Sequence, residues 1–283
     1  MIGWLLAAPA LAVLALAFLW PMAGLFRISL NRTTETGAME VALTTDSYTR
    51  LIEDDFTREL VWNTVTLAAS SAALAVALAL PIALLVRGAS PRWRGLLALA
   101  AVAPLLVSGT ARLVGWMAIL GDRGMINALL TGMGLSSGPL ALINNWTGVR
   151  IGLVESLMPY AVLVLLAGLG RLDPKLEEAA ATLGANRFRT FLRVTLPLAA
   201  PALLAAWLLT LVLGISAFIT PRLMGGGRVF VLATEIYDLA LETVDWPGAA
   251  ALAMLLLGGL LALMILRGVV AAFFSASRAE KTP

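Results

Sequence analysis

The stretch LEEAAATLGANRFRTFLRVTLPLAAP, residues 176–201, decides the fold of this chain. Ala and Glu, which favour helix, dominate its first half, and Asp173 and Pro174 suit the N-cap and first turn of that helix. Gly184 permits a sharp reversal, because glycine adopts positive φ without steric conflict. Residues 186–194 then resume as a basic amphipathic helix. We therefore predict two short helices joined by a glycine turn.

The segments on either side of this stretch are apolar enough to cross a membrane. The 283 residues have a mean hydropathy of +0.92 and only 13% charged residues, whereas soluble domains carry about 25%. A helix needs about 20 apolar residues to cross a bilayer core. Six stretches approach or exceed that length: residues 2–30, 60–86, 96–120, 148–169, 196–219 and 247–266. The sequence predicts an all-α membrane protein with six transmembrane helices, forming a single domain over residues 1–283.

The first apolar stretch differs from a secretory signal peptide, which starts with basic residues and ends at a small-residue cleavage site. Here no Lys or Arg precedes the apolar run, Pro9 and Pro21 interrupt it, and Arg27 follows it. We interpret this stretch as an uncleaved anchor helix, with a cleaved signal as the alternative.

The distribution of Lys and Arg predicts the orientation, because short loops rich in these residues stay in the cytoplasm. One set of loops is basic with few acids: Arg87, Arg92, Arg94, Arg171, Lys175, Arg187, Arg189, Arg193, Arg267, Arg278 and Lys281. The opposite set mixes basic residues with many acids. Arg27 and Arg32, at the far end of the first span, contradict this bias locally. With an even number of spans, the global bias predicts that both termini and the stretch at residues 173–195 are cytoplasmic.

Several functions are excluded by what the sequence lacks. There is no His and no Cys, so the usual general base and the usual metal ligands are missing, and we predict no catalytic residue and no metal site. The basic residues form no dense run with interleaved aromatics, which argues against nucleic acid as a partner. No GxxxxGK[ST] sequence occurs, so this chain supplies no phosphate-binding loop of an ATPase.

The segment between the third and fourth spans, residues 121–147, contains three glycine-rich turns around a short apolar run at residues 125–130. We predict an outer loop with a partly embedded short helix, and a plain external loop is an equal alternative. Non-helical backbone at membrane depth requires protein or water to satisfy its polar groups.

The stretch at residues 176–201 resembles part of the permease subunits of ABC importers with the binding-protein-dependent, type I fold. Their cytoplasmic signature is EAA, three residues, Gly, nine residues, Ile, one residue, Leu-Pro. The matching positions here, with Val in place of Ile, are Glu178, Ala179, Ala180, Gly184, Val194, Leu196 and Pro197. Further segments such as GDRGMINALL, TPRLMGGG and DWPGAAAL, within residues 47–263, look like the first of the two permeases of spermidine/putrescine-type importers. Permeases for phosphonates, opines, thiamine and iron are similar as well.

This resemblance implies a core permease region at residues 60–267, a bacterial inner-membrane location and a set of partners. The partners are a second and distinct permease, two ATPases that hold ATP and Mg, and an extracytoplasmic solute-binding protein, while this chain itself binds no cofactor. The stretch from Glu178 to Gly184 and Ala185 would dock into the ATPase. The solute would be a polyamine or a related small cation. An ion-coupled secondary transporter, which needs buried carboxylates for its coupling ion, is the rival class.

Charges inside apolar spans are costly, and each is a hypothesis about function. Arg112 and Glu155 stand out, and counting from the span ends gives both a depth of roughly 10 to 12 Å. They are candidates for a pathway or gate, as a structural ion pair or, for an unpaired Glu155, as a site for a cationic solute. Trp116 and Tyr160 lie near the same level, where cation–π contact competes with ordinary interfacial anchoring.

The last outer loop is acidic and contains two aromatic residues. Tyr237, Asp238, Asp245 and Trp246 are candidates for contact with the binding protein. A solvated acidic loop is the competing interpretation.

Overall fold

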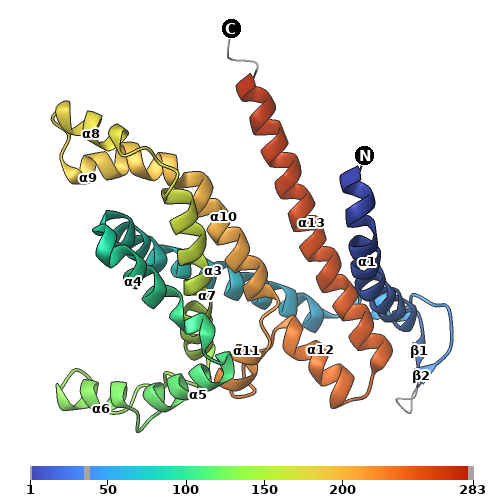
Figure 1. The fold of residues 1–283 in the computed structure, drawn as a ribbon. Helices are drawn as coiled ribbons and strands as arrows, with labels where there is room; N and C mark the ends of the chain where they lie inside the picture. The colour runs from blue at the N-terminus through green and yellow to red at the C-terminus, as the bar shows by residue number, and fades with distance from the viewer. Residues whose placement is uncertain (1, 35–38, 280–283) are drawn as a thin grey trace. The chain divides into compact units, whose positions relative to one another are not determined.

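The computed structural model describes residues 2–34 and 39–279, and it is mostly helical (Figure 1). A two-residue strand β1 (Arg32–Thr33) pairs antiparallel with β2 (Met39–Glu40), with Arg32 opposite Glu40. The helices are α1 (Ile2–Ser29), α2 (Asp46–Glu53), α3 (Asp55–Gly88), α4 (Pro91–Val102), the 3-10 helix η1 (Ala103–Leu106), α5 (Gly109–Leu120), α6 (Met125–Gly132), α7 (Trp146–Leu169), α8 (Lys175–Thr182), α9 (Arg187–Thr190), the π-helical segment η2 (Phe191–Thr195), α10 (Leu196–Ile215), α11 (Ile219–Met224), α12 (Leu232–Leu241) and α13 (Trp246–Ala279).

Six helical stretches in the described residues are long and apolar enough to span a membrane, which confirms the predicted all-α, six-span membrane protein. They are Ala7–Ser29, Asp55–Gly88, Gly109–Gly132, Trp146–Leu169, Arg187–Ile215 and Trp246–Ile265. The first, second and fourth agree closely with the predicted spans.

The prediction that residues 96–120 form one continuous helix, the third span, is wrong. The chain forms α4, the short η1 with Pro104 in its first turn, and then a break at Val107, whose backbone is extended. Proline has no N–H to donate and disfavours helix in the residue before it. Ser108 restarts the helix as the N-cap of α5, its side chain accepting from the Ala111 N–H. The membrane-length stretch here runs instead through α5 and α6.

The fifth and sixth spans differ from prediction at their ends. The fifth begins earlier, because α9 and η2 continue into α10 without a break, and it ends at Ile215 rather than 219, since Ser216 caps it and α11 follows as a separate helix. The sixth, α13, continues beyond residue 266 to Ala279, and the sequence of that extension contains no proline to stop it. The predicted short helix at residues 125–130 is confirmed as α6.

The chain divides into two compact units, and the single domain predicted from the sequence stays a prediction. The central unit comprises residues 62–230 and is built around α7 and α10, which pack along each other. Its core consists of Ala, Val and Leu side chains from these helices and α3. At Gly168 a Cβ atom would overlap the Ala202 Cβ atom, so the two helices approach closely through small residues, as membrane helices commonly do.

The terminal unit comprises residues 1–61 and 231–283, and in it α13 packs against α1, α2 and α12. Its buried core contains Leu60, Leu232 and Leu252. The β1 strand is attached to this unit through Thr33, whose hydroxyl donates to the Asp245 carboxylate. The unit therefore combines helices from the N-terminal and C-terminal parts of the chain.

Candidate functional site

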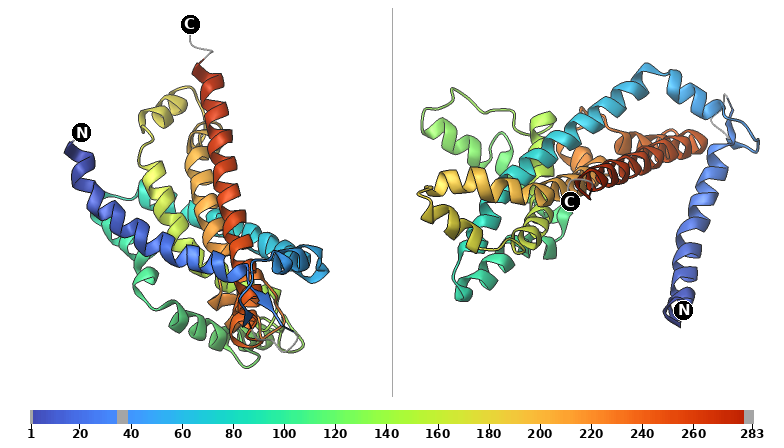
Figure 2. Two further views of the ribbon diagram at one scale, coloured as in Figure 1. Left: turned by 90° about the vertical axis from the view of Figure 1, so that its right-hand side faces the viewer. Right: turned by 90° about the horizontal axis from the view of Figure 1, so that it is seen from above.

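The predicted helix, glycine turn and helix are present, and they lie at one end of α10 (Figures 1 and 2). The Asp173 carboxylate accepts a hydrogen bond from the Lys175 N–H at 3.0 Å, which caps the start of α8. Gly184 has φ +81°, the left-handed conformation that the sequence predicted for the reversal. Asn186 caps the next helix, its side chain accepting from the Arg189 N–H at 2.8 Å. Local sequence therefore determines this element.

The motif residues form a largely exposed surface. Glu178, Ala179 and Gly184 are exposed, Ala180 and Ala185 are half-buried, and the motif ends at Leu196 and Pro197 in the first turn of α10.

Two apolar side chains beside that surface were not among the predicted site residues. Leu183 is 88% exposed and Phe188 is 68% exposed, although both are large and apolar. Side chains of this kind, grouped around one turn, are typical of a protein contact surface. The coupling role of the segment stays a prediction.

Glu177 connects this segment to two transmembrane helices, a contact that the sequence did not predict. Its Oε1 atom accepts from the Arg87 guanidinium at 2.7 Å and from the Thr195 hydroxyl at 2.8 Å. Arg87 lies in the last turn of α3, and buried Thr195 ends the π-helical segment before α10. Burial acts to raise the pKa of Glu177, but the hydrogen bonds from Arg87 and Thr195 outweigh it and hold that pKa below its ordinary value.

No local pattern could have identified this link, since Arg87 is 90 residues from Glu177 in the sequence. The π-helical segment beside it is a rare backbone form that is often found at functional sites. Of the two adjacent glutamates, sequence reasoning selected the exposed Glu178 for coupling and missed the structural contribution of Glu177.

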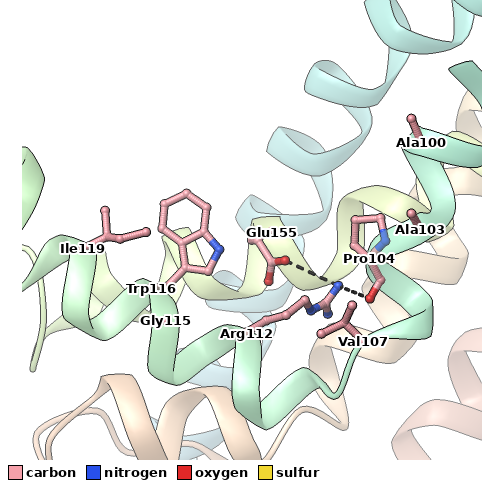
Figure 3. Close-up of a pocket in the computed structure, with 9 residues that line it drawn as sticks. All are labelled: Ala100, Ala103, Pro104, Val107, Arg112, Gly115, Trp116, Ile119 and Glu155. Carbon is pink, nitrogen blue, oxygen red and sulfur yellow. Dashed lines mark hydrogen bonds and ion pairs between the residues drawn. The ribbon is translucent and has the colours of Figure 1, made fainter.

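Arg112 and Glu155 meet, as their matched depth predicted. The Arg112 Nη1 atom lies 3.4 Å from Glu155 Oε1, and both side chains are about 15% exposed (Figure 3). The same Nη1 atom donates to the Pro104 carbonyl at 2.7 Å. The helix breaks after η1, within the predicted third span. This break leaves the Pro104 carbonyl able to accept from the Arg112 guanidinium. The Arg112 Nε atom is buried and forms no hydrogen bond within the described residues.

Two cavities adjoin this ion pair. One, of about 440 Å³, lies between α4, α5 and α7 and is lined by Ala100, Ala103, Pro104, Val107, Arg112, Gly115, Trp116, Ile119 and Glu155 (Figure 3). The other, of about 400 Å³, lies between α3, α5 and α7 and is lined by Leu74, Leu78, Trp116, Thr147, Arg150, Ile151, Val154, Glu155 and Met158. Trp116 and Glu155 line both cavities.

The remaining candidates divide between the two units. Tyr160 is exposed on α7 and does not belong to the described lining of either cavity. In the terminal unit, Asp245 accepts from the Gly248 N–H at 2.9 Å and caps α13, and it also pairs with Arg50 at 3.2 Å. Asp245 therefore stabilises the unit, whatever else it contacts. Trp246 beside it is exposed, whereas Tyr237 and Asp238 on α12 are half-buried.

A third cavity, of about 310 Å³, lies in the terminal unit near these residues. Asp54 and Glu235 contribute acidic side chains to it. Burial, together with the neighbouring Asp238 and Asp54 carboxylates, raises the pKa of Glu235. The contact of this loop with a binding protein stays a prediction.

Comparison with known proteins identifies the family. Residues 61–274 match the model of the binding-protein-dependent transport system inner membrane component. The spermidine/putrescine transport system permease protein PotB of Haemophilus influenzae is 33% identical over 224 residues, covering 79% of this chain and 77% of that protein. The PotB protein of Escherichia coli is 30% identical over 213 residues, covering 75% and 77%.

Solved structures agree on the fold. A bacterial ABC transporter that imports the acidic polysaccharide alginate superposes with a TM-score of 0.71 at 21% identity, over 99% of this chain and 96% of that one. The MetNI methionine ABC transporter gives a TM-score of 0.57 at 17% identity, over 77% and 98%. The chain thus belongs to the inner-membrane components of binding-protein-dependent transport systems, and it is the permease subunit of an ABC importer in the bacterial inner membrane.

Proposed function

We propose that this permease couples ATP hydrolysis on separate subunits to solute movement through the segment from α8 to α9. The proposal rests on two features found together: the turn between α8 and α9 exposes apolar side chains, and α8 is attached to the transmembrane helices. Leu183 and Phe188 offer a contact surface, while Glu177 attaches α8 to Arg87 and Thr195. A partner that moves this turn would therefore move α3 and α10 with it.

The partners in this proposal are those of an ABC importer. Two ATPase subunits bind ATP and Mg, a second and distinct permease completes the pathway, and an extracytoplasmic binding protein delivers the solute. This chain binds no cofactor itself. Both termini and the α8–α9 segment lie in the cytoplasm, which the excess of Lys and Arg in those loops supports.

The solute in this proposal is a small aliphatic amine, either a polyamine such as spermidine or putrescine or a related small cation. The names of the PotB relatives support this class. Phosphonate, opine, thiamine and iron remain alternative solutes for the same importer class. An ion-coupled secondary transporter has less support, because Glu155 is paired with Arg112 rather than free to hold a coupling ion.

Arg112 and Glu155 act in this proposal as part of the pathway wall, where they help to close it in the inward-facing state. Their separation of 3.4 Å and low exposure support a contact that excludes water. Trp116, which borders both adjoining cavities, supplies an aromatic face beside the pair.

Single cysteines test the orientation, since the natural chain contains none. Cysteines at Leu241 and Val244, both exposed, should react with an impermeant thiol reagent added outside spheroplasts. A cysteine at Leu183 should react only after the membrane is opened. The opposite labelling pattern would show that the topology is inverted and would rule out the coupling proposal.

A further inference from the structure

The short helix α6 is held in a fixed orientation by one buried side chain. Asn127 lies on α6 and is almost fully buried. Its amide nitrogen donates to the carbonyls of Gly121 and Leu140 at 3.0 Å, and its amide oxygen accepts from the Leu140 N–H at 2.8 Å. The chain also turns tightly before the helix, since a Cβ atom on Gly124 would overlap the Ile119 carbonyl. One face of α6 is therefore fixed against the loop on either side of it.

The opposite face of α6 is apolar and exposed. Met125, Leu129 and Met133, the last at the C-cap, recur at every fourth residue and so lie along one side of the helix. Each of them is more than half exposed. Asn127 is two residues from both Met125 and Leu129, which places it about 160° around the helix from each. The burial of Asn127 thus directs the three apolar side chains away from the loop. Exposed apolar groups of this kind mark a contact with a membrane or another protein.

The position of α6 along the membrane normal follows from the length of α7. In the central unit, α6 lies near the end of α7 that is remote from α8 (Figures 1 and 2). The 24 residues of α7 extend over about 36 Å, and the hydrocarbon core of a bilayer is about 30 Å thick. With α8 in water at one end, α6 is at the level of the lipid headgroups at the other. This level does not depend on which side of the membrane is the cytoplasm.

The sequence around α6 is free of charge on every face. No charged residue occurs from Gly124 to Val149, although 13% of the whole chain is charged. The charged residues that precede this run, Asp122 and Arg123, are exposed in the turn before α6. A contact with a second protein requires only one face of a segment to lack charge. Lipid penalises charge on every side that it covers, so the composition favours lipid as the partner.

We propose that α6 lies in the water–lipid interface at the bilayer surface opposite the α8–α9 segment, with Met125, Leu129 and Met133 against phospholipid acyl chains. Thr131 is exposed about 160° around the helix from Leu129, and it faces water and the headgroups. Because Asn127 ties α6 to the loop between α5 and α7, this lipid contact holds the adjoining ends of both spans at a constant depth. The inference goes beyond the proposed function and requires no particular solute.

The test uses the complete importer, with its second permease and its ATPase subunits, in nanodiscs of phosphatidylethanolamine and phosphatidylglycerol. A nitrobenzoxadiazole fluorophore is attached to a cysteine at Leu129, since the natural chain contains no cysteine. The unsubstituted chain in the same importer measures any labelling of the other subunits. Fluorescence is quenched in three separate samples: by lipid with a nitroxide near the headgroup, by lipid with a nitroxide deep in the acyl chain, and by iodide in the water.

A label at Thr131 is the matched control, because this residue is exposed on the other side of the same helix. The shallow nitroxide should quench the Leu129 label about threefold more strongly than the Thr131 label, and iodide should show the reverse preference. At Leu129 the shallow nitroxide should also quench more strongly than the deep one. A label at Met133 should behave like the one at Leu129, and it replaces that label if Leu129→Cys does not assemble.

Charged substitutions assign the lipid contact to the apolar face. In a chain labelled at Met133, Leu129→Asp should lower quenching by the shallow nitroxide at least about twofold, since it places a carboxylate against the acyl chains. Thr131→Asp adds the same charge on the other side and should leave that quenching unchanged. Equal responses to the two substitutions would contradict the assignment of the lipid contact to this face.

Three results of the quenching experiment would overturn the inference. Equal quenching of the Leu129 and Thr131 labels by iodide, with none by either nitroxide, would show a plain loop in water. Stronger quenching of the Leu129 label by the deep nitroxide would show that α6 inserts into the bilayer core. Protection of that label from all three quenchers would show that a protein subunit covers this face. The proposed function is measured separately as ATP-driven uptake and would stand in each case.

Discussion

The α8–α9 segment and the Arg112–Glu155 pair on α5 and α7 belong to the same unit but are built from opposite kinds of contact. In the first, capping by Asp173 and Asn186 and the turn at Gly184 are local, and the surface is exposed. In the second, Arg112 depends on Glu155 from another helix, and both are mostly buried. The exposed segment is suited to bind and release a partner, whereas the buried pair is suited to hold one arrangement until a solute or a movement disrupts it.

The largest effect is expected at the turn. Gly184→Val places a β-branched residue at φ +81°, which such residues strongly disfavour, and should reduce ATP-driven uptake by tenfold or more, a loss on the order of 1.4 kcal/mol or greater. Uptake into proteoliposomes measures it. Gly95→Val in α4 is the matched control, because neither glycine has an atom within 4 Å of its added Cβ and Gly95 has an ordinary φ. Equal effects of the two changes would show that the left-handed turn has no special role.

The next effect concerns the buried pair. Arg112→Leu or Glu155→Leu alone leaves a charge unpaired, which typically destabilises by about 3 kcal/mol when the pair is fully buried and by less at the partial burial seen here. The double change should recover most of the thermal stability of the assembled complex.

The double variant also separates a gate from a structural pair. Recovery of stability without recovery of uptake supports a gate. Additive losses of stability in the double variant would mean that the two side chains do not interact in the assembled importer.

Variants of the adjacent Glu177 and Glu178 should have smaller effects, and they separate docking of the ATPase from transmission of its movement. Glu178→Ala removes an exposed carboxylate and should weaken retention of the ATPase severalfold during purification, with the spans intact. Glu177→Ala removes the acceptor for Arg87 and Thr195, and should leave the ATPase bound while uptake falls more than ATP hydrolysis. Identical behaviour of the two variants would contradict the division between docking and transmission.

The smallest effect is a dependence on pH. Because hydrogen bonds hold the pKa of Glu177 below its ordinary value of 4.5, the link contributes its full stability above that pH. The contribution is lost as the pH falls through the lower pKa of the folded state. The difference in melting temperature between wild type and Glu177→Gln should therefore be constant from pH 8 to pH 5 and shrink only below about pH 4.5. A difference that already shrinks near pH 6 would show that this link is not the titrating contact.

The same contrast explains what the sequence could predict. Apolar length and the motif around Gly184 gave the helical class, the six spans and the turn, because those features depend on neighbours in the chain. The third span was wrong because Pro104 and Ser108 break a run whose apolar composition continues through them. Matched depth suggested the pairing of Arg112 with Glu155, but the Pro104 carbonyl contact follows from that break.

Apart from the Arg112–Glu155 pair, the long-range contacts of the site were beyond sequence reasoning. The motif singled out Glu178, and nothing in the sequence indicated that Arg87 binds the neighbouring Glu177. Asp245 looked like one acid among several, although it caps α13 and binds Arg50.

The most direct test of the coupling account is a photo-activated crosslinker attached to a cysteine at Leu183, the most exposed large apolar side chain of the α8–α9 segment. Illumination of the assembled importer should join this chain to the ATPase subunit, and the yield should change when ATP is added, because in the proposed coupling ATP binding moves the contact. The same label at Leu106, which is 82% exposed at the end of η1, is the control and should give no ATPase product. A crosslink from Leu106 but none from Leu183 would contradict the account.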